Sequence, residues 1–279
     1  MDFPSLRSSF PSNPFRQHLE ADFNRSINST RGRCRTWGPF EGHAHTHTVI
    51  FLHEEGSTAD QFASELFESE TSKHRDKLGT LRTIFPSFRW IFPMAPKTKH
   101  FDQEISQWFN MRSTKEPNLE PKEQVEGLRE SMDRMLRLIQ VEEKVISTER
   151  IFLGGIGQGF AVMYPTFFLD GRQFAGLIGL SSWAPLEALK LMKWKFDEIQ
   201  KITTQYERCT PAFLSHSRVD QVVPVEEGRK LRDGLVAESN VVVRWQEYHG
   251  GGHWVQSPEG VDDIVDFLAE ALPDNERPD

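Results

Sequence analysis

The sequence predicts an α/β fold with a mostly parallel central sheet and helices on both faces. Two observations lead to this prediction. Short, continuously apolar runs recur along the chain, as expected of strands that are covered on both faces. Segments with helical spacing of apolar residues lie between them, and such alternation gives parallel strands joined by right-handed crossovers. At 279 residues the chain is long enough to bury a sizeable core.

The pattern along the chain divides it into an arm, a domain and a tail. Residues 1–40 are rich in Ser, Pro, Asn and Arg and are expected to form an irregular arm. The domain spans residues 41–272, and residues 273–279 are a C-terminal tail. Strands are predicted at 47–53, 88–96, 150–155, 174–182, 211–217 and 241–248. Helices are predicted at 57–69, 122–140, 158–169, 185–202, 225–238 and 258–271.

One long stretch inside the predicted domain, residues 97–121, has no clear periodicity. Long ordered loops on α/β sheets often cover functional sites. An excursion over the surface explains the same stretch equally well, so the sequence leaves both interpretations open.

Composition and charge exclude several classes of function. The formal charge of −8 argues against nucleic-acid and anionic-membrane partners. No apolar run approaches the roughly 20 residues of a membrane span, and the N-terminus lacks the apolar core of a signal peptide. The 2 cysteines, Cys34 and Cys209, are far apart and indicate neither a disulfide framework nor a metal motif. A cytoplasmic protein is expected, with its oligomeric state left open.

The segment IFLGGIGQGFA, residues 151–161, predicts a strand, a sharp glycine turn and a helix. Two kinds of site use this design. Dinucleotide-binding folds carry G-x-G-x-x-G, whereas hydrolases carry G-x-S-x-G with a nucleophile at the tip of a strained turn. The glycine spacing and the position of the turn in mid-chain favour the hydrolase turn, but Gly157 stands where the nucleophile belongs.

Downstream, two further residues fall in the order that a hydrolase site requires. Asp220 follows the strand of LSHSRVDQVVP, and His253 lies in the glycine-rich segment YHGGGHW after the next strand. Nucleophile, acid and histidine occur in this order in α/β-hydrolases. The histidine acts as a base near neutral pH, and the carboxylate fixes its tautomer.

Several motifs together resemble the acyl-protein thioesterase, or phospholipase/carboxylesterase, family of α/β-hydrolases, in the style of its fungal members. These motifs are TVIFLH, FPMAP, QWFN, QVEGLRES, IFLGGIGQG, GLSSW, TPAFLSHSRVDQVVP and GGGHWVQSPEGVDDIVDFL. The resemblance covers roughly residues 45–272 and implies an α/β-hydrolase fold without a large lid domain. It also implies acyl ester or thioester hydrolysis by a Ser–His–Asp triad, without a cofactor.

The resemblance also assigns expected roles to individual residues. Asp220 and His253 match the family's acid and base. Gln158 matches the residue after the nucleophile, whose backbone N–H helps to form the oxyanion hole, and Glu55 matches the second oxyanion position. No metal is implied, and the expected ligand is a small acyl or carbonyl compound.

The departures from the family pattern are equally informative. Gly157 replaces the nucleophilic serine, and the family's LHG is LHE here, which places Glu54 before Glu55. Ser217 and Ser182 replace glycines, and Asn110 replaces an aspartate.

Three interpretations of the missing serine remain open. The chain is an ordinary esterase disabled by replacement of residue 157, or it is a pseudo-hydrolase kept for binding. In the third and favoured interpretation, His253, oriented by Asp220, is a general base in a cyclisation, elimination or isomerisation. Glu54 and Glu55 are either a second acid or base, or a solvated pair in a loop. The fungal style of the resemblance suggests secondary metabolism as the setting.

Aromatic residues in the matched segments are candidates for an apolar substrate pocket. They are Trp108, Phe109, Trp183 and Trp254. Because large aromatics dominate core packing, ordinary core positions explain them equally well.

Histidines alternate in HAHTHTVIFLH, where His43, His45, His47 and His53 share one face of the predicted first strand. Pairs of histidines can bind zinc, but a structural site usually needs four ligands. An exposed first strand is the favoured explanation.

Overall fold

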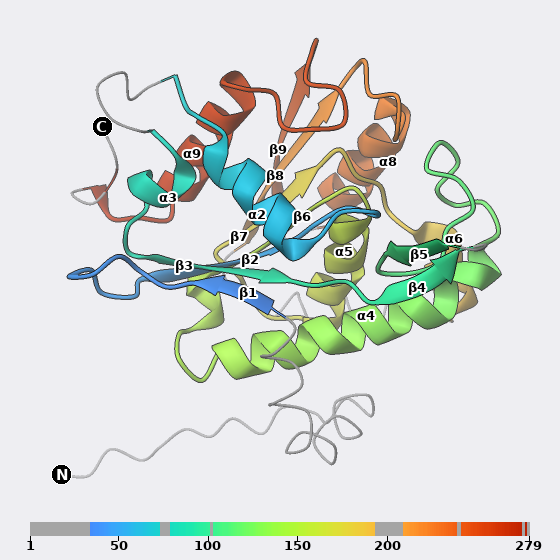
Figure 1. The fold of residues 1–279 in the computed structure, drawn as a ribbon, viewed down its shortest axis with the longest axis horizontal. Helices are drawn as coiled ribbons and strands as arrows, with labels where there is room; N and C mark the ends of the chain where they lie inside the picture. The colour runs from blue at the N-terminus through green and yellow to red at the C-terminus, as the bar shows by residue number, and fades with distance from the viewer. Residues whose placement is uncertain are drawn as a thin grey trace.

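The computed structural model describes residues 34–72, 79–100, 103–192, 209–238, 241–274 and 277. Within these residues a 7-stranded sheet has the order β1-β3-β2-β6-β7-β8-β9 (Figure 1). Its strands are β1 (Cys34–Trp37), β2 (His47–Leu52), β3 (Phe88–Pro93), β6 (Ile151–Ile156), β7 (Gly176–Leu180), β8 (Thr210–Ser217) and β9 (Val241–Tyr248). Only the pairing of β1 with β3 is antiparallel among these described neighbours, so the predicted mostly parallel sheet is confirmed.

Helices cover both faces of the sheet, as predicted (Figure 1). They are α2 (Ala59–Glu68), α3 (Leu81–Ile84), α4 (Pro121–Glu142), α5 (Gln158–Asp170), α6 (Leu186–Leu191), α8 (Val225–Val236) and α9 (Glu259–Ala269), with a short 3-10 helix at Thr148–Arg150. One buried apolar cluster joins α4, α5, α6 and α8 to the sheet, and a second cluster joins α2, α3 and α9 to the opposite face. None of the helices described is long and apolar enough to cross a membrane.

The first strand of the predicted domain is buried, and the expectation that it is exposed is wrong. β2 lies between β3 and β6, and every one of its residues is buried. His47 packs against the rings of Phe88 and Phe152, with centroids 4.9 and 6.1 Å away. His53 is fully buried at the end of the strand. Within the described residues no group of three or more His, Cys, Asp or Glu side chains is arranged to hold a metal ion.

The expectation of an irregular arm over residues 1–40 is wrong for its last part. Cys34–Trp37 form β1, which pairs with β3 in the register Cys34↔Pro93 to Trp37↔Trp90. The pairing covers what would otherwise be an open edge at β3. The Trp37 ring meets Phe92 edge-on, with centroids 5.5 Å apart. Residues 1–33 lie outside the described part of the chain.

The aperiodic stretch 97–121 contains a hairpin that the sequence did not indicate. β4 (Lys97–His100) and β5 (Gln103–Ser106) pair antiparallel in a separate 2-stranded sheet. A loop then leads to α4. Of the predicted helix at 185–202, residues 185–192 are described and contain α6, and residues 193–202 lie outside the described part.

The sheet topology brings four loops together at one edge. The loops that follow β2, β6, β8 and β9 carry Glu54, Gly157, Asp220 and His253, respectively. These strands are parallel, so their carboxyl ends face the same side of the sheet. Ligands of open α/β sheets bind at that edge.

Candidate active site

The turn between β6 and α5 holds residue 157 in an unusual conformation. Gly157 has φ 52° and ψ −124°, a region that favours glycine because it has no Cβ. Its N–H donates to the carbonyl of Leu180 at 3.0 Å, and its own carbonyl accepts from the Ser182 hydroxyl at 2.6 Å. The backbone is therefore fixed from two sides, as in a strained strand-to-helix elbow.

A second glycine explains why the loop after β2 lies directly beside this elbow. A Cβ on Gly159 would lie 2.4 Å from the carbonyl oxygen of Leu52 and 2.6 Å from that of His53. Glycine therefore lets the first turn of α5 press against the end of β2. This contact brings Glu54 next to Gly157.

His253 and Asp220 form the acid–histidine pair that the sequence predicts. The Nδ1 atom of His253 lies 2.8 Å from Oδ2 of Asp220, whose side chain is fully buried. The Oδ1 atom of Asp220 accepts the backbone N–H groups of Val222 at 2.8 Å and Val223 at 3.0 Å. The loop that carries the carboxylate thus also holds it in place.

A second histidine, which the sequence did not single out, shares the same carboxylate. Nε2 of His216 lies 3.3 Å from Oδ2 of Asp220 and 2.9 Å from the carbonyl of Val223. Burial opposes ionisation of Asp220, but hydrogen bonds from His216 and His253, with that from Val222, hold its pKa well below its usual range. Asp220 is therefore ionised throughout the physiological range. A histidine four residues before the acid, at the end of a strand, was the available signal.

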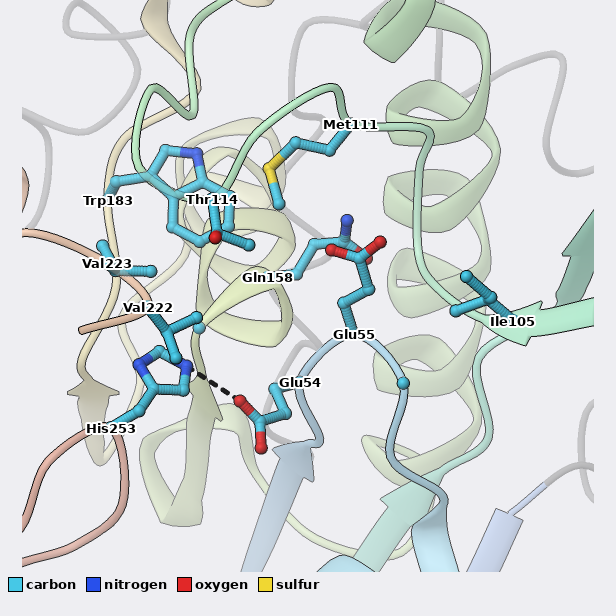
Figure 2. Close-up of a pocket in the computed structure, with 12 residues that line it drawn as sticks. Glu54, Glu55, Ile105, Met111, Thr114, Gln158, Trp183, Val222, Val223 and His253 are labelled. Atoms are coloured by element: carbon cyan, nitrogen blue, oxygen red, sulfur yellow. Dashed lines mark ion pairs between the residues drawn. The ribbon is translucent and has the colours of Figure 1, made fainter. Parts of the chain in front are cut away.

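Glu54 occupies the other side of the same imidazole (Figure 2). Its Oε2 atom lies 2.8 Å from Nε2 of His253, and 31% of its side chain is exposed. Burial opposes charge on His253, but hydrogen bonds to Asp220 and Glu54 outweigh it and raise the pKa of His253 to about 9. At neutral pH an imidazolium therefore bridges two carboxylates.

His53 fixes the backbone of Glu54. Burial lowers the pKa of His53 to about 4, so the ring is neutral at pH 7. Its Nε2 accepts the N–H of Ala95 at 3.1 Å, which leaves Nδ1 to donate to the carbonyl of Glu54 at 2.7 Å. The Trp108 indole in turn donates to the carbonyl of His53 at 2.8 Å. Histidine at position 53 is thus a positioning residue for the loop that carries Glu54.

A pocket of about 240 Å³ opens over the Glu54–His253 pair (Figure 2). Carboxylates, an imidazole and an amide form one part of it, and apolar side chains form the rest. Its lining residues are Glu54, Glu55, Gly56, Ile105, Met111, Thr114, Gly157, Gln158, Trp183, Val222, Val223 and His253. The volume lies below the roughly 300–1,000 Å³ of typical pockets for drug-sized ligands.

The structure brings the predicted Glu54, Glu55, Gly157, Gln158, Trp183 and His253 to the pocket lining, and Asp220 is linked to it through His253. Trp183 lines it, whereas the fully buried Trp108 serves the loop contact to His53. Trp254 packs edge-on against Phe62 in the core on the α2 side, with centroids 5.6 Å apart. Phe109 is also fully buried and belongs to the apolar cluster on the α4 side, so only Trp183 of the four aromatic candidates lines the pocket.

The backbone and the side chain of Gln158 make different contributions to the site. Its backbone begins α5, where the first N–H groups of a helix have no intrahelical acceptor. Its side chain accepts from the N–H of Trp108 at 2.6 Å and donates to the carbonyl of Phe109 at 2.9 Å. The side chain therefore anchors the loop after β5, and only the backbone N–H remains for the oxyanion role that the sequence predicts.

Sequence reasoning missed most of the apolar lining. Ile105, Met111 and Thr114 come from the stretch 97–121, which therefore does contribute to the site. Val222 and Val223 come from the Asp220 loop. The motif QVVP beside the predicted acid was a usable signal, whereas nothing in the irregular stretch marked which of its residues face the pocket.

Known proteins resemble this chain over most of its length. The Phospholipase/Carboxylesterase family profile matches residues 41–272. Acyl-protein thioesterase 1 of Yarrowia lipolytica is 31% identical over 231 residues, which cover 82% of this chain and 93% of that protein. Acyl-protein thioesterase 1 of Gibberella zeae is 32% identical over 232 residues, covering 82% and 92%.

Solved structures show the same fold. The crystal structure of Zea mays acyl-protein thioesterase 2 has a TM-score of 0.62 at 21% identity and covers 86% of this chain and 99% of that one. Arabidopsis thaliana SOBER1 has a TM-score of 0.61 at 20% identity, covering 81% and 99%. With the family profile spanning most of the sequence, the chain belongs to the phospholipase/carboxylesterase family of α/β-hydrolases.

Proposed function

We propose that this chain is an enzyme that transfers protons within a small, apolar carbonyl or ester metabolite and forms no covalent intermediate. The reaction class is isomerisation, elimination or cyclisation. One observation carries the proposal: Nε2 of His253 is paired with Glu54 at 2.8 Å, while residue 157 has no side chain to act as a nucleophile.

Glu54 and His253 divide the roles of base and acid. The sequence alone favours His253 as the base, but an imidazole with a pKa of about 9 holds its proton at neutral pH. The proton acceptor in the pocket is then the carboxylate of Glu54, and Nε2–H of His253 is the donor. Such positioned acid–base groups contribute typically 10²–10⁴-fold to a rate.

The pair can return to its starting state without another reactant. Glu54 takes a proton from the carbon next to the substrate carbonyl, and Nε2–H of His253 delivers a proton to the developing oxygen or leaving group. The proton on Glu54 then passes across the 2.8 Å contact to the neutral imidazole. The net reaction therefore needs no oxidant, reductant or covalent partner.

The N-terminus of α5 supplies the expected site for the substrate carbonyl. Gln158 begins the helix and lines the pocket, so its N–H can donate to an enolate-like oxygen. The positive end of the helix dipole supports negative charge there. The adjoining Ile105, Met111 and Trp183 suit an apolar substituent.

Family membership supports an acyl compound as substrate, and the small pocket supports a short one. A cytoplasmic location and a role in secondary metabolism are further parts of the proposal that rest on the sequence resemblance alone.

The test measures proton abstraction directly and does not require the natural substrate. The purified chain is incubated in D₂O with small neutral ketones and short acyl thioesters, and deuterium entry at the α-carbon is followed by NMR. We expect catalysed exchange that falls by about 10²-fold or more in Glu54→Gln. Exchange should also decline above about pH 9, where His253 loses its proton.

Two further variants sharpen the result. Glu55→Gln removes a neighbouring carboxylate of the pocket but keeps the Glu54–His253 contact, so a smaller loss is expected. Glu126→Gln changes an exposed carboxylate on α4 and serves as the control. Probes that bind but show equal exchange with the parent and Glu54→Gln would exclude this chemistry and favour a binding role.

A further inference from the structure

A side chain at residue 157 would point into space that His253 and Glu54 already occupy. A Cβ at this position would lie 3.1 Å from Nε2 of His253 and 3.3 Å from Cβ of Glu54. Both distances are shorter than ordinary van der Waals contacts between such atoms. Residue 157 therefore points at the reactive nitrogen, and Glu54 lies across the approach.

The hydrogen-bonding capacity of that nitrogen is also used. Nε2 of an imidazole carries one N–H or one lone pair, and Glu54 engages it at 2.8 Å. A hydroxyl at residue 157 would compete with Glu54 for the same nitrogen. The hydroxyl would be the weaker competitor, because Glu54 is a carboxylate and hydrogen bonds to charged groups are the stronger ones.

The rest of the site does not depend on the Glu54 side chain. Asp220 holds His253 through its other ring nitrogen, Nδ1. Leu180 and Ser182 hold the backbone of Gly157. His53 contacts the carbonyl of Glu54 and not its carboxylate. Shortening Glu54 would therefore free Nε2 while the elbow and the acid–histidine pair stay in place.

We propose that Glu54 and Gly157 form a reciprocal pair that determines which reaction this site performs. The carboxylate at residue 54 requires a residue without a side chain at 157 and excludes serine chemistry there. Removing the carboxylate and adding a hydroxyl together open a second activity, ester hydrolysis. This inference does not depend on which reaction Glu54 and Gly157 support in the natural chain, because it concerns only what replacing both residues does.

The second activity is a balanced two-step reaction. The hydroxyl introduced at residue 157 attacks the ester carbonyl, and its proton moves to Nε2 of His253, which passes it to the departing oxygen so that an alcohol or phenol leaves. Water then attacks the acyl group on residue 157, and Nε2 takes one proton from this water. Nε2 returns that proton to the oxygen of residue 157, so the acid is released and the hydroxyl is restored.

The experiment compares the parent with Glu54→Gly, Gly157→Ser and the double variant. Hydrolysis of p-nitrophenyl acetate and butyrate is measured, and phenylmethylsulfonyl fluoride labelling is followed by intact mass. We expect at least about 10²-fold faster hydrolysis in the double variant than in either single variant, with one label per chain. Equal rates in Gly157→Ser and the double variant would overturn the proposal, as would a folded double variant that neither hydrolyses nor labels.

Two additional variants keep the result interpretable. Residue 157 has a positive φ, so serine there introduces strain, and circular dichroism must confirm folding. Should the double variant not fold, Glu54→Ala with Gly157→Ser leaves a residue with a Cβ at position 54 and receives the same assays and criteria. Glu187→Gln with Gly157→Ser, which alters an exposed carboxylate on α6, should match Gly157→Ser alone. A silent result here leaves the proton-exchange test unaffected, so the two proposals fail separately.

Discussion

The two carboxylates that flank His253 have opposite surroundings. Asp220 is fully buried, and its oxygens accept from both histidines and from the N–H groups of the following loop. Glu54 meets the same imidazole at the same 2.8 Å, but 31% of its side chain is exposed in the pocket. The two contacts are equal in length but differ in their surroundings, because one carboxylate is immobilised by its partners and the other faces the pocket.

The difference predicts that Asp220 contributes mainly to stability and that Glu54 is the carboxylate available for the proposed chemistry. A buried ion supported by several donors is costly to disturb, since its partners are left without an acceptor. A partly exposed ion is screened by water and contributes little to stability. Variants of Asp220, His253 and Glu54 test this comparison.

The largest effect is expected for Asp220→Ala. Removing the carboxylate leaves Nδ1 of the charged His253 without its acceptor and takes one of two acceptors from Nε2 of the buried His216, so a loss of about 3–5 kcal/mol in unfolding free energy is expected. The pKa of His253 should fall from about 9, because one of its two carboxylate partners is gone. Chemical denaturation and an NMR titration of the His253 ring measure the two effects. A loss below 1 kcal/mol, or an unchanged titration, would contradict the structural role of Asp220.

A change in stability with pH is expected next. The pKa of His253 is raised to about 9 in the folded chain, against roughly 6.5 when unfolded. Its stabilising contribution is therefore complete below about pH 6.5 and disappears as the pH rises through 9. The difference in unfolding free energy between the parent and His253→Asn should shrink over this window. The pKa of Asp220 is lowered in the folded chain, so its stabilising contribution to the unfolding free energy is present above about pH 4 and is lost as the pH falls further. A difference between parent and variant that stays constant from pH 6.5 to 9 would show that His253 is not charged.

The smallest effect on stability is expected for Glu54→Gln. Water screens the partly exposed ion pair between Glu54 and His253, so the unfolding free energy should change by less than about 1 kcal/mol. The pKa of His253 should nevertheless fall, because Glu54 is one of the two groups that raise it. Denaturation and the same NMR titration separate the two outcomes. If Glu54→Gln destabilised the chain as much as Asp220→Ala, the distinction between the two carboxylates would be lost.

Local sequence signals were sufficient for the strands of the sheet other than β1, for most helices and for the pair Asp220–His253. Each of these depends on short-range chemistry, such as apolar runs, the Thr58 cap that accepts from Gln61, and glycines around a sharp turn. The order of the turn, the acid and the histidine also lies in the sequence. Family membership of the region 41–272 follows from the same motifs.

Tertiary structure decided what the sequence left open. The sequence presents Glu54 and Glu55 as equivalent neighbours in a loop, but only packing of α5 on the end of β2 brings Glu54 against Gly157 and onto Nε2 of His253. The burial of His53, the sharing of Asp220 by His216 and the role of Trp108 depend likewise on contacts between distant segments. A side chain's direction and its pKa are set by neighbours in space, and most of those neighbours are remote in sequence.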